Sequence, residues 1–142
     1  RVEDDGIGLG FLEGYGLKEG ALAVSIAHDH HGIVALGKKK EDVVKAANWV
    51  IDHQGGLAFL KNGELKTGLP LPLAGLMATE NYEKVRFRIS EMENLLRENG
   101  AAWKEPLFLS FWLGMEVAPY YRITERGILS TEDYSVIPPV VE

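Results

Sequence analysis

The dipeptide Asn62-Gly63 is the feature that most constrains the fold of this chain, because it lies between two short runs of strand-forming residues at positions 57–61 and 64–67. Asn and Gly adopt the positive backbone φ angles that a two-residue turn between antiparallel strands requires. The pattern therefore predicts a β-hairpin over residues 57–67, and with it an antiparallel component of the sheet.

Two longer segments carry apolar residues at helical spacing. The first covers residues 41–53 and ends before Gly55-Gly56, and the second runs from a capping Thr79 to about Asn99. We expect a helix in each segment. The residues expected to form the apolar faces are Val43, Val44, Ala46, Ala47, Val50 and Ile51 in the first helix, and Tyr82, Val85, Ile89, Met92 and Leu96 in the second.

The remaining segments predict short strands and one extended stretch. Residues 21–26 and 33–36 are β-capable, and the aromatic-rich remainder, 106–142, is predicted to be strand-like. The Leu-Pro-Leu-Pro-Leu run at 69–73 cannot be a central strand, because proline donates no ladder hydrogen bond; we expect it to cross the surface or rim a cavity. A chain of 142 residues is too short for a barrel of eight strand–helix units. We expect one α+β domain over residues 1–142, with a mixed or antiparallel sheet packed against two main helices.

Glycine occupies every other position at Gly6, Gly8 and Gly10. This alternation favours a strand with one face pressed against another backbone. A phosphate-binding loop is the alternative, but such a loop needs a preceding strand and a following helix, and here the glycines begin the pattern.

Composition and charge narrow the class of protein further. The net charge of −6 argues against a nucleic-acid binder, which needs a basic surface. The absence of cysteine excludes disulfides, thiolate zinc sites and cysteine nucleophiles, and it favours a reducing compartment. No apolar run approaches the ~20 residues needed to span a bilayer, so we expect a cytoplasmic protein without membrane association. The chain begins with Arg1, as expected for a piece of a longer polypeptide.

Three of the four histidines fall in the run His28-Asp29-His30-His31. On an extended backbone His28 and His30 project to one face, and Asp29 and His31 to the other. Three interpretations remain open: a polar loop at a strand end, a self-contained metal site with His28 and His30 as ligands, or a group of hydrogen-bonding side chains that face a site built elsewhere. The metal site needs at least three protein ligands, and His53 has no motif relation to the pair.

No complete catalytic motif is present. The chain contains no Gly-x-Ser-x-Gly elbow, no phosphate loop and no His-Glu-x-x-His helix. Ser25 and Ser110 have no evident general base or orienting group in the sequence. We therefore expect no catalytic residue in this chain and no activity of the chain by itself.

The histidine run and its surroundings carry a resemblance to a known family. Residues 14–23 lead into Ser25-Ile26-Ala27-His28-Asp29-His30-His31, and residues 69–77 read Leu-Pro-Leu-Pro-Leu-Ala-Gly-Leu-Met. With Gly55-Gly56, Leu109-Ser110-Phe111 and the tail Ile123-Thr124-Glu125-Arg126-Gly127-Ile128, these segments resemble the C-terminal domain of bacterial and archaeal adenine deaminases over essentially the whole chain. His28, Asp29 and His31 match the family pattern, whereas His30 stands where the family has Ser and Gly32 where it has Asn.

The resemblance implies a domain of a metal-dependent amidohydrolase that converts adenine and water to hypoxanthine and ammonia. A separate N-terminal barrel would bind a divalent ion (manganese, iron or zinc) with ligands outside this chain and activate water. His28, Asp29, His30 and His31 would then face the substrate or the interface with that barrel, and the parent enzyme would form a homo-oligomer. Two alternatives stay open: a non-catalytic purine- or metal-binding module, and a structural or oligomerisation domain.

Overall fold

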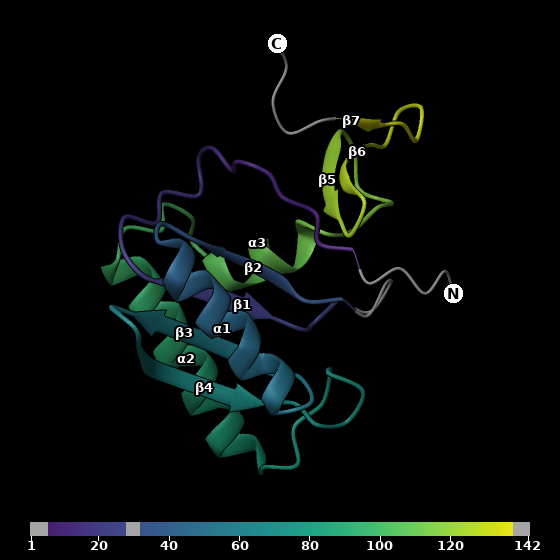
Figure 1. Ribbon diagram of the computed structural model, residues 1–142. Coiled ribbons are helices and arrows are strands. Elements are labelled where there is room, and N and C mark those ends of the chain that lie inside the picture. Colours follow the sequence, from purple (N-terminus) through teal and green to yellow (C-terminus); the bar gives the residue numbers. More distant parts are fainter. Residues whose placement is uncertain (1–5, 28–31, 138–142) are drawn as a thin grey trace.

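The computed structural model describes residues 6–27 and 32–137, and its centre is a four-stranded antiparallel sheet (Figure 1). The strands β1 (Ala21–Val24), β2 (Val34–Gly37), β3 (Gly56–Lys61) and β4 (Glu64–Pro70) lie in the order β2-β1-β3-β4. The predicted hairpin is confirmed: β3 pairs with β4 around Asn62 and Gly63, whose φ angles are 54° and 79°.

Helices cover both faces of this sheet. Helix α1 (Lys40–Asp52) packs against β1, β2 and β3 on one face, and α2 (Tyr82–Glu98) packs on the other, where it contacts β4 and α3 (Pro106–Trp112). Successive side chains of β1 therefore point alternately toward α1 and toward α2. The face toward α1 is built from small side chains, which allow a close approach, and the opposite face from larger ones. The α1 side contains Ala21, Ala23, Ala46, Val50, Ala58 and Leu60; the α2 side contains Leu22, Val24, Leu57, Phe59, Met92 and Leu96.

The loop between β3 and β4 is held by α1. Asp42 is buried, and its carboxylate accepts hydrogen bonds from the backbone N–H groups of Asn62 at 3.1 Å and Gly63 at 2.6 Å. Asp42 lies in the first turn of α1, so this side chain ties the helix to the hairpin turn.

Helix α2 begins after Asn81, so the predicted cap at Thr79 is wrong. The Asn81 side chain accepts a hydrogen bond from the Lys84 N–H at 3.0 Å, the bond by which a cap satisfies a free donor of the first turn. Only the second half of the predicted apolar stripe is buried, at Met92 and Leu96, whereas Tyr82 stays exposed near the start of the helix.

The expectation that residues 106–142 are entirely strand-like is wrong, because α3 occupies their first part. Proline stands in the first turn of α3, where its missing N–H group is not needed. The next free donor, the Leu107 N–H, is satisfied by the Glu93 carboxylate of α2 at 3.1 Å. The predicted strands are found beyond this helix.

A second antiparallel sheet contains β5 (Tyr121–Thr124), β6 (Gly127–Ser130) and β7 (Val136–Ile137) in that order. Gly8 and Gly10 lie against this sheet, but residues 6–12 form no strand, so the predicted strand is wrong and the predicted close packing is confirmed. A Cβ atom on Gly8 would overlap the Thr124 carbonyl oxygen, and one on Gly10 would lie 3.3 Å from the Ile128 side chain. Among the described residues, none of the helices is long and apolar enough to cross a bilayer.

Candidate functional site

Two segments that carry the family resemblance, residues 25–27 before the histidine run and residues 69–77, meet at one edge of the central sheet, the edge formed by the ends of its strands. Strand β1 ends at this edge with Val24, β2 begins there with its partner Val34, and residues 25–33 connect them. The N-terminal end of β3 and the C-terminal end of β4 lie at the same edge, because Val24 is also paired with Leu57 and Leu57 with Leu69. The loop that follows β4 therefore begins at the same end of the sheet as residues 25–27, which follow β1 (Figure 1).

The candidate residues His28, Asp29, His30 and His31 lie outside the described residues, so their predicted orientation stays a prediction. The chain on either side is described. Ala27 is buried, and its N–H donates to the Ser25 carbonyl at 2.8 Å.

Ser25 joins this connection to β3 and to the loop after β4. Its Oγ donates a hydrogen bond to the Gly75 carbonyl at 2.6 Å and accepts one from the Gly56 N–H at 2.8 Å. Its own N–H donates to the Gly56 carbonyl at 3.0 Å. One buried hydroxyl therefore holds three segments that lie 31 and 50 residues apart in sequence.

Glycines make this close approach possible. A Cβ on Gly55 would overlap the Cα of Gly75 and would lie 2.8 Å from the Leu71 carbonyl oxygen. A Cβ on Gly75 would lie 3.3 Å from the Ser25 Oγ. Gly55 and Gly56 were expected only to end the helix, but they also let the loop after β4 lie directly on the sheet edge.

The loop after β4 folds into a tight turn at residues 73–77. Leu73 and Met77 exchange backbone hydrogen bonds of 3.3 and 3.2 Å, and Ala74 and Gly75 both have positive φ, at 58° and 72°, as in a type I′ turn. Leu69 and Leu71 are buried and anchor the run, whereas Leu73 is 49% exposed and Met77 is 58% exposed. The prediction of an extended apolar segment is confirmed up to Leu71, and the turn beyond it presents apolar side chains to solvent near Ser25, whose Oγ contacts Gly75.

Neither candidate serine is arranged as a nucleophile. Among the described residues, Ser25 Oγ bonds only to backbone atoms, and Ser110 is buried within α3, where its Oγ donates to the Leu107 carbonyl at 2.6 Å. A nucleophile needs an adjacent general base, and neither hydroxyl contacts a titratable side chain in these bonds.

The described residues do not fit a metal ion. No group of three or more His, Asp or Glu side chains comes together in residues 6–27 and 32–137. His53 is used otherwise: its ring stacks on Trp49 at a centroid distance of 3.8 Å, and its Nδ1 lies 2.7 Å from the Trp49 carbonyl oxygen. The proposed pair His28 and His30 lies outside the described residues, so a metal site that includes this pair stays a prediction.

The described residues form an α+β domain in which Ser25 joins the end of β1 to the start of β3 and to the loop after β4. A family model described as the adenine deaminase C-terminal domain matches residues 1–135. The chain belongs to this family.

Similar proteins are considerably longer than this chain. It is 34% identical over 131 residues to an adenine deaminase of Brucella abortus (strain 2308), a match that covers 92% of this chain and 22% of the relative. An adenine deaminase of Bdellovibrio bacteriovorus is 37% identical over 134 residues, with 94% of this chain and 23% of the relative covered. For an adenine deaminase of Shigella sonnei the identity is 37% over 126 residues, with 89% and 21% covered. The chain thus spans less than a quarter of the curated relatives that it matches.

Proposed function

We propose that this chain serves as the C-terminal domain of an adenine deaminase, in which the sheet edge that carries residues 28–31 and the turn at residues 73–77 borders the site where adenine is hydrolysed to hypoxanthine and ammonia. The family assignment supports the reaction, and the fastening of both motifs by Ser25 supports the location. A cytoplasmic location and assembly into a homo-oligomer belong to the same proposal.

In this proposal a preceding barrel domain would hold the divalent ion, and that ion would supply activated water for the hydrolysis of adenine. Because the described residues contain no set of three metal-binding side chains, no metal-dependent step is assigned to them. The contribution of this domain is to bind, orient and shield: imidazole and carboxylate groups from His28, Asp29 and His31 hydrogen-bond to the substrate or to the barrel, and the apolar side chains of Leu73 and Met77 exclude water from one side.

The observation that carries the proposal is the contact between Ser25, which lies three residues before the histidine run in the sequence, and the turn after β4. A loop that only connected two strands would not require a second loop held against it. Here the buried Ser25 hydroxyl and the close contact of Gly55 with Gly75 hold the loop after β4 in place. Substrate sites are commonly built from such loops on a rigid scaffold. The hydrogen bonds of Ser25 would hold the apolar side chains of Leu73 and Met77 at a constant position relative to the histidines.

The proposal is tested by steady-state kinetics on the complete polypeptide that carries this domain. We expect His28→Ala and His31→Ala each to lower kcat/KM for adenine by about 10- to 100-fold, the loss that corresponds to one hydrogen bond in a desolvated site. His53→Gln is the matched control, because His53 stacks on Trp49, outside both motifs, and this variant should keep the parent value.

Two results would contradict the proposal. If His28→Ala and His31→Ala matched the parent enzyme while altering its mass in solution, the domain would be an oligomerisation element. If the isolated 142-residue chain deaminated adenine, the chemistry would not belong to a preceding barrel. Calorimetric titration of the isolated chain with adenine, and separately with zinc or manganese, tests the binding-module alternative, because tight binding without turnover is the result expected of such a module.

A further inference from the structure

An apolar ridge lies on the surface at the N-terminal end of the described chain. It is formed by the side chains of Ile7, Leu9 and Phe11, which are 85%, 69% and 91% exposed. These residues alternate with Gly6, Gly8 and Gly10 and precede the first described charged residue, Glu13. A contiguous apolar strip with this degree of exposure is unusual on a monomer and is typical of an interface.

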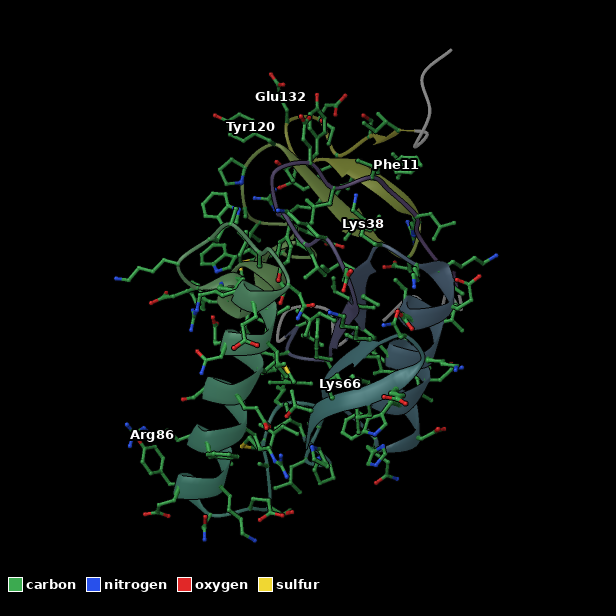
Figure 2. The ribbon with its side chains drawn as sticks, turned by 90° about the vertical axis from the view of Figure 1, so that its left-hand side faces the viewer. Phe11, Lys38, Lys66, Arg86, Tyr120 and Glu132 are labelled. Atoms are coloured by element: carbon green, nitrogen blue, oxygen red, sulfur yellow. The ribbon has the colours of Figure 1, made fainter. Side chains whose placement is uncertain are left out.

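The orientation of the ridge follows from the glycines. Gly8 is pressed on the backbone of β5 and β6, where a Cβ would overlap the Thr124 carbonyl oxygen and lie 3.0 Å from the Gly127 nitrogen. Because side chains alternate along an extended segment, packing the glycine side on the second sheet turns Ile7, Leu9 and Phe11 away from it. Figure 2 shows Phe11 beside the strands of this sheet, at the rim of the molecule.

The second sheet also lacks a complete apolar layer of its own. None of the residues of β5, β6 and β7 is fully buried, and Tyr121 and Val136 are exposed. By contrast, every residue of β1 is fully buried between the helices. The ridge and the second sheet therefore form one region that the other described residues leave partly exposed.

We infer that the ridge of Ile7, Leu9 and Phe11 docks onto the part of the polypeptide that precedes this domain in the longer relatives. This partner rests on the proposed function. The position of the ridge in the chain favours it over a second copy of the domain. The matched family is a C-terminal domain that covers 22% of the Brucella relative, so the larger part of such a protein joins the domain at the end where the ridge lies. The ridge also carries no charge, which suits a permanent apolar contact within one polypeptide.

The absence of cysteine from the chain allows a direct test by thiol labelling. Ile7→Cys, Leu9→Cys and Phe11→Cys are made one at a time, both in the 142-residue chain and in the complete polypeptide that carries it, and the rate of maleimide modification of each site is followed by peptide mass spectrometry. Ile51→Cys is the matched control, because Ile51 is an exposed apolar residue on α1, which packs on the central sheet.

We expect the three ridge sites to react at least 10-fold more slowly in the complete polypeptide than in the short chain, and the Ile51→Cys site to react equally in both. Equal rates at the ridge sites in the two proteins would overturn the inference. Protection that rises with the concentration of the short chain, together with a dimer in sedimentation, would assign the ridge to a second copy and also overturn it. Labelling does not depend on turnover, so an intact ridge contact in a polypeptide without deaminase activity would contradict the proposed function and leave the interface standing.

Discussion

The Oγ of Ser25 donates a 2.6 Å hydrogen bond to the carbonyl oxygen of Gly75 and thereby attaches the turn after β4 to the end of β1. The same oxygen accepts the Gly56 N–H. The two segments that most resemble the adenine deaminase family are thus joined through one buried hydroxyl, and the stability of this joint can be measured.

Replacing Ser25 by alanine removes a donor and an acceptor from a buried position. The Gly56 N–H and the Gly75 carbonyl then lose a partner, so we expect Ser25→Ala to lower the free energy of unfolding by about 1–3 kcal/mol. Urea denaturation followed by circular dichroism measures this change. Ser90→Ala, at an exposed position of α2, is the control and should change the free energy by less than about 0.5 kcal/mol. A Ser25→Ala variant as stable as this control would show that the joint contributes nothing.

The turn at Ala74 and Gly75 contains backbone strain that can be relieved or increased. Ala74 has a φ of 58°, which disfavours any residue with a Cβ, so Ala74→Gly should raise the free energy of unfolding by up to about 1 kcal/mol. Gly75→Ala should lower it, because the added Cβ meets both a positive φ and the Ser25 hydroxyl. Opposite shifts of the midpoint in urea are the expected result, and a loss of stability in Ala74→Gly would contradict this account.

Asp42 connects α1 to the β3–β4 turn, and its replacement should affect the hairpin. Asp42→Ala leaves the N–H groups of Asn62 and Gly63 without their carboxylate partner, so we expect the free energy of unfolding to fall by about 1–3 kcal/mol. Hydrogen exchange should then become faster at the amides of Asn62 and Gly63. Glu41→Ala, at the exposed neighbouring position, is the control and should leave both quantities close to their parent values. Unchanged exchange at the turn in Asp42→Ala would contradict the role of Asp42.

The raised pKa of Glu93 makes the free energy of unfolding depend on pH. Burial between α2 and α3 is the main cause that raises the pKa of Glu93 above the ordinary carboxyl value, against the hydrogen bond from Leu107 and the charge of Arg97. Folding therefore favours the protonated form. The resulting stabilisation is complete below the ordinary carboxyl pKa and is lost as the pH rises through the higher pKa of the folded state.

We therefore expect the parent chain to lose stability relative to Glu93→Gln as the pH rises through the range above the ordinary carboxyl pKa. Unfolding in urea at a series of pH values measures the difference. Glu64→Gln provides a control of opposite sign, since the hydrogen bond and charge of Lys66 lower the pKa of this exposed carboxyl; its small contribution is lost as the pH falls. A difference between the parent and Glu93→Gln that does not change with pH would contradict the effect of burial.

Local sequence determined the elements whose signals are short in range. Asn62-Gly63 specified the β3–β4 turn because two adjacent residues suffice to set its backbone angles. The helical spacing of apolar residues placed both ends of α1 and the C-terminal end of α2 within one or two residues of their observed positions, because the pattern repeats over several turns. The start of α2 was misplaced, because Thr79 and Asn81 both favour a cap position and the choice between them depends on which side chain can reach the first free N–H group.

Tertiary structure decided the features that depend on residues distant in sequence. Helix α3 escaped prediction because its seven residues are too few for a periodic signal, and the Glu93 carboxylate that satisfies its Leu107 N–H comes from another helix. The role of Ser25 was equally hidden, since a serine at the end of a strand carries no sign of a partner 50 residues away. The clustering of the histidines was evident from the sequence alone. That residues 25–27, which lead into the histidine run, lie at the edge where the Leu-Pro turn is held became known only from the fold, because the pairing of β1 with β3 and of β3 with β4 brings those segments together.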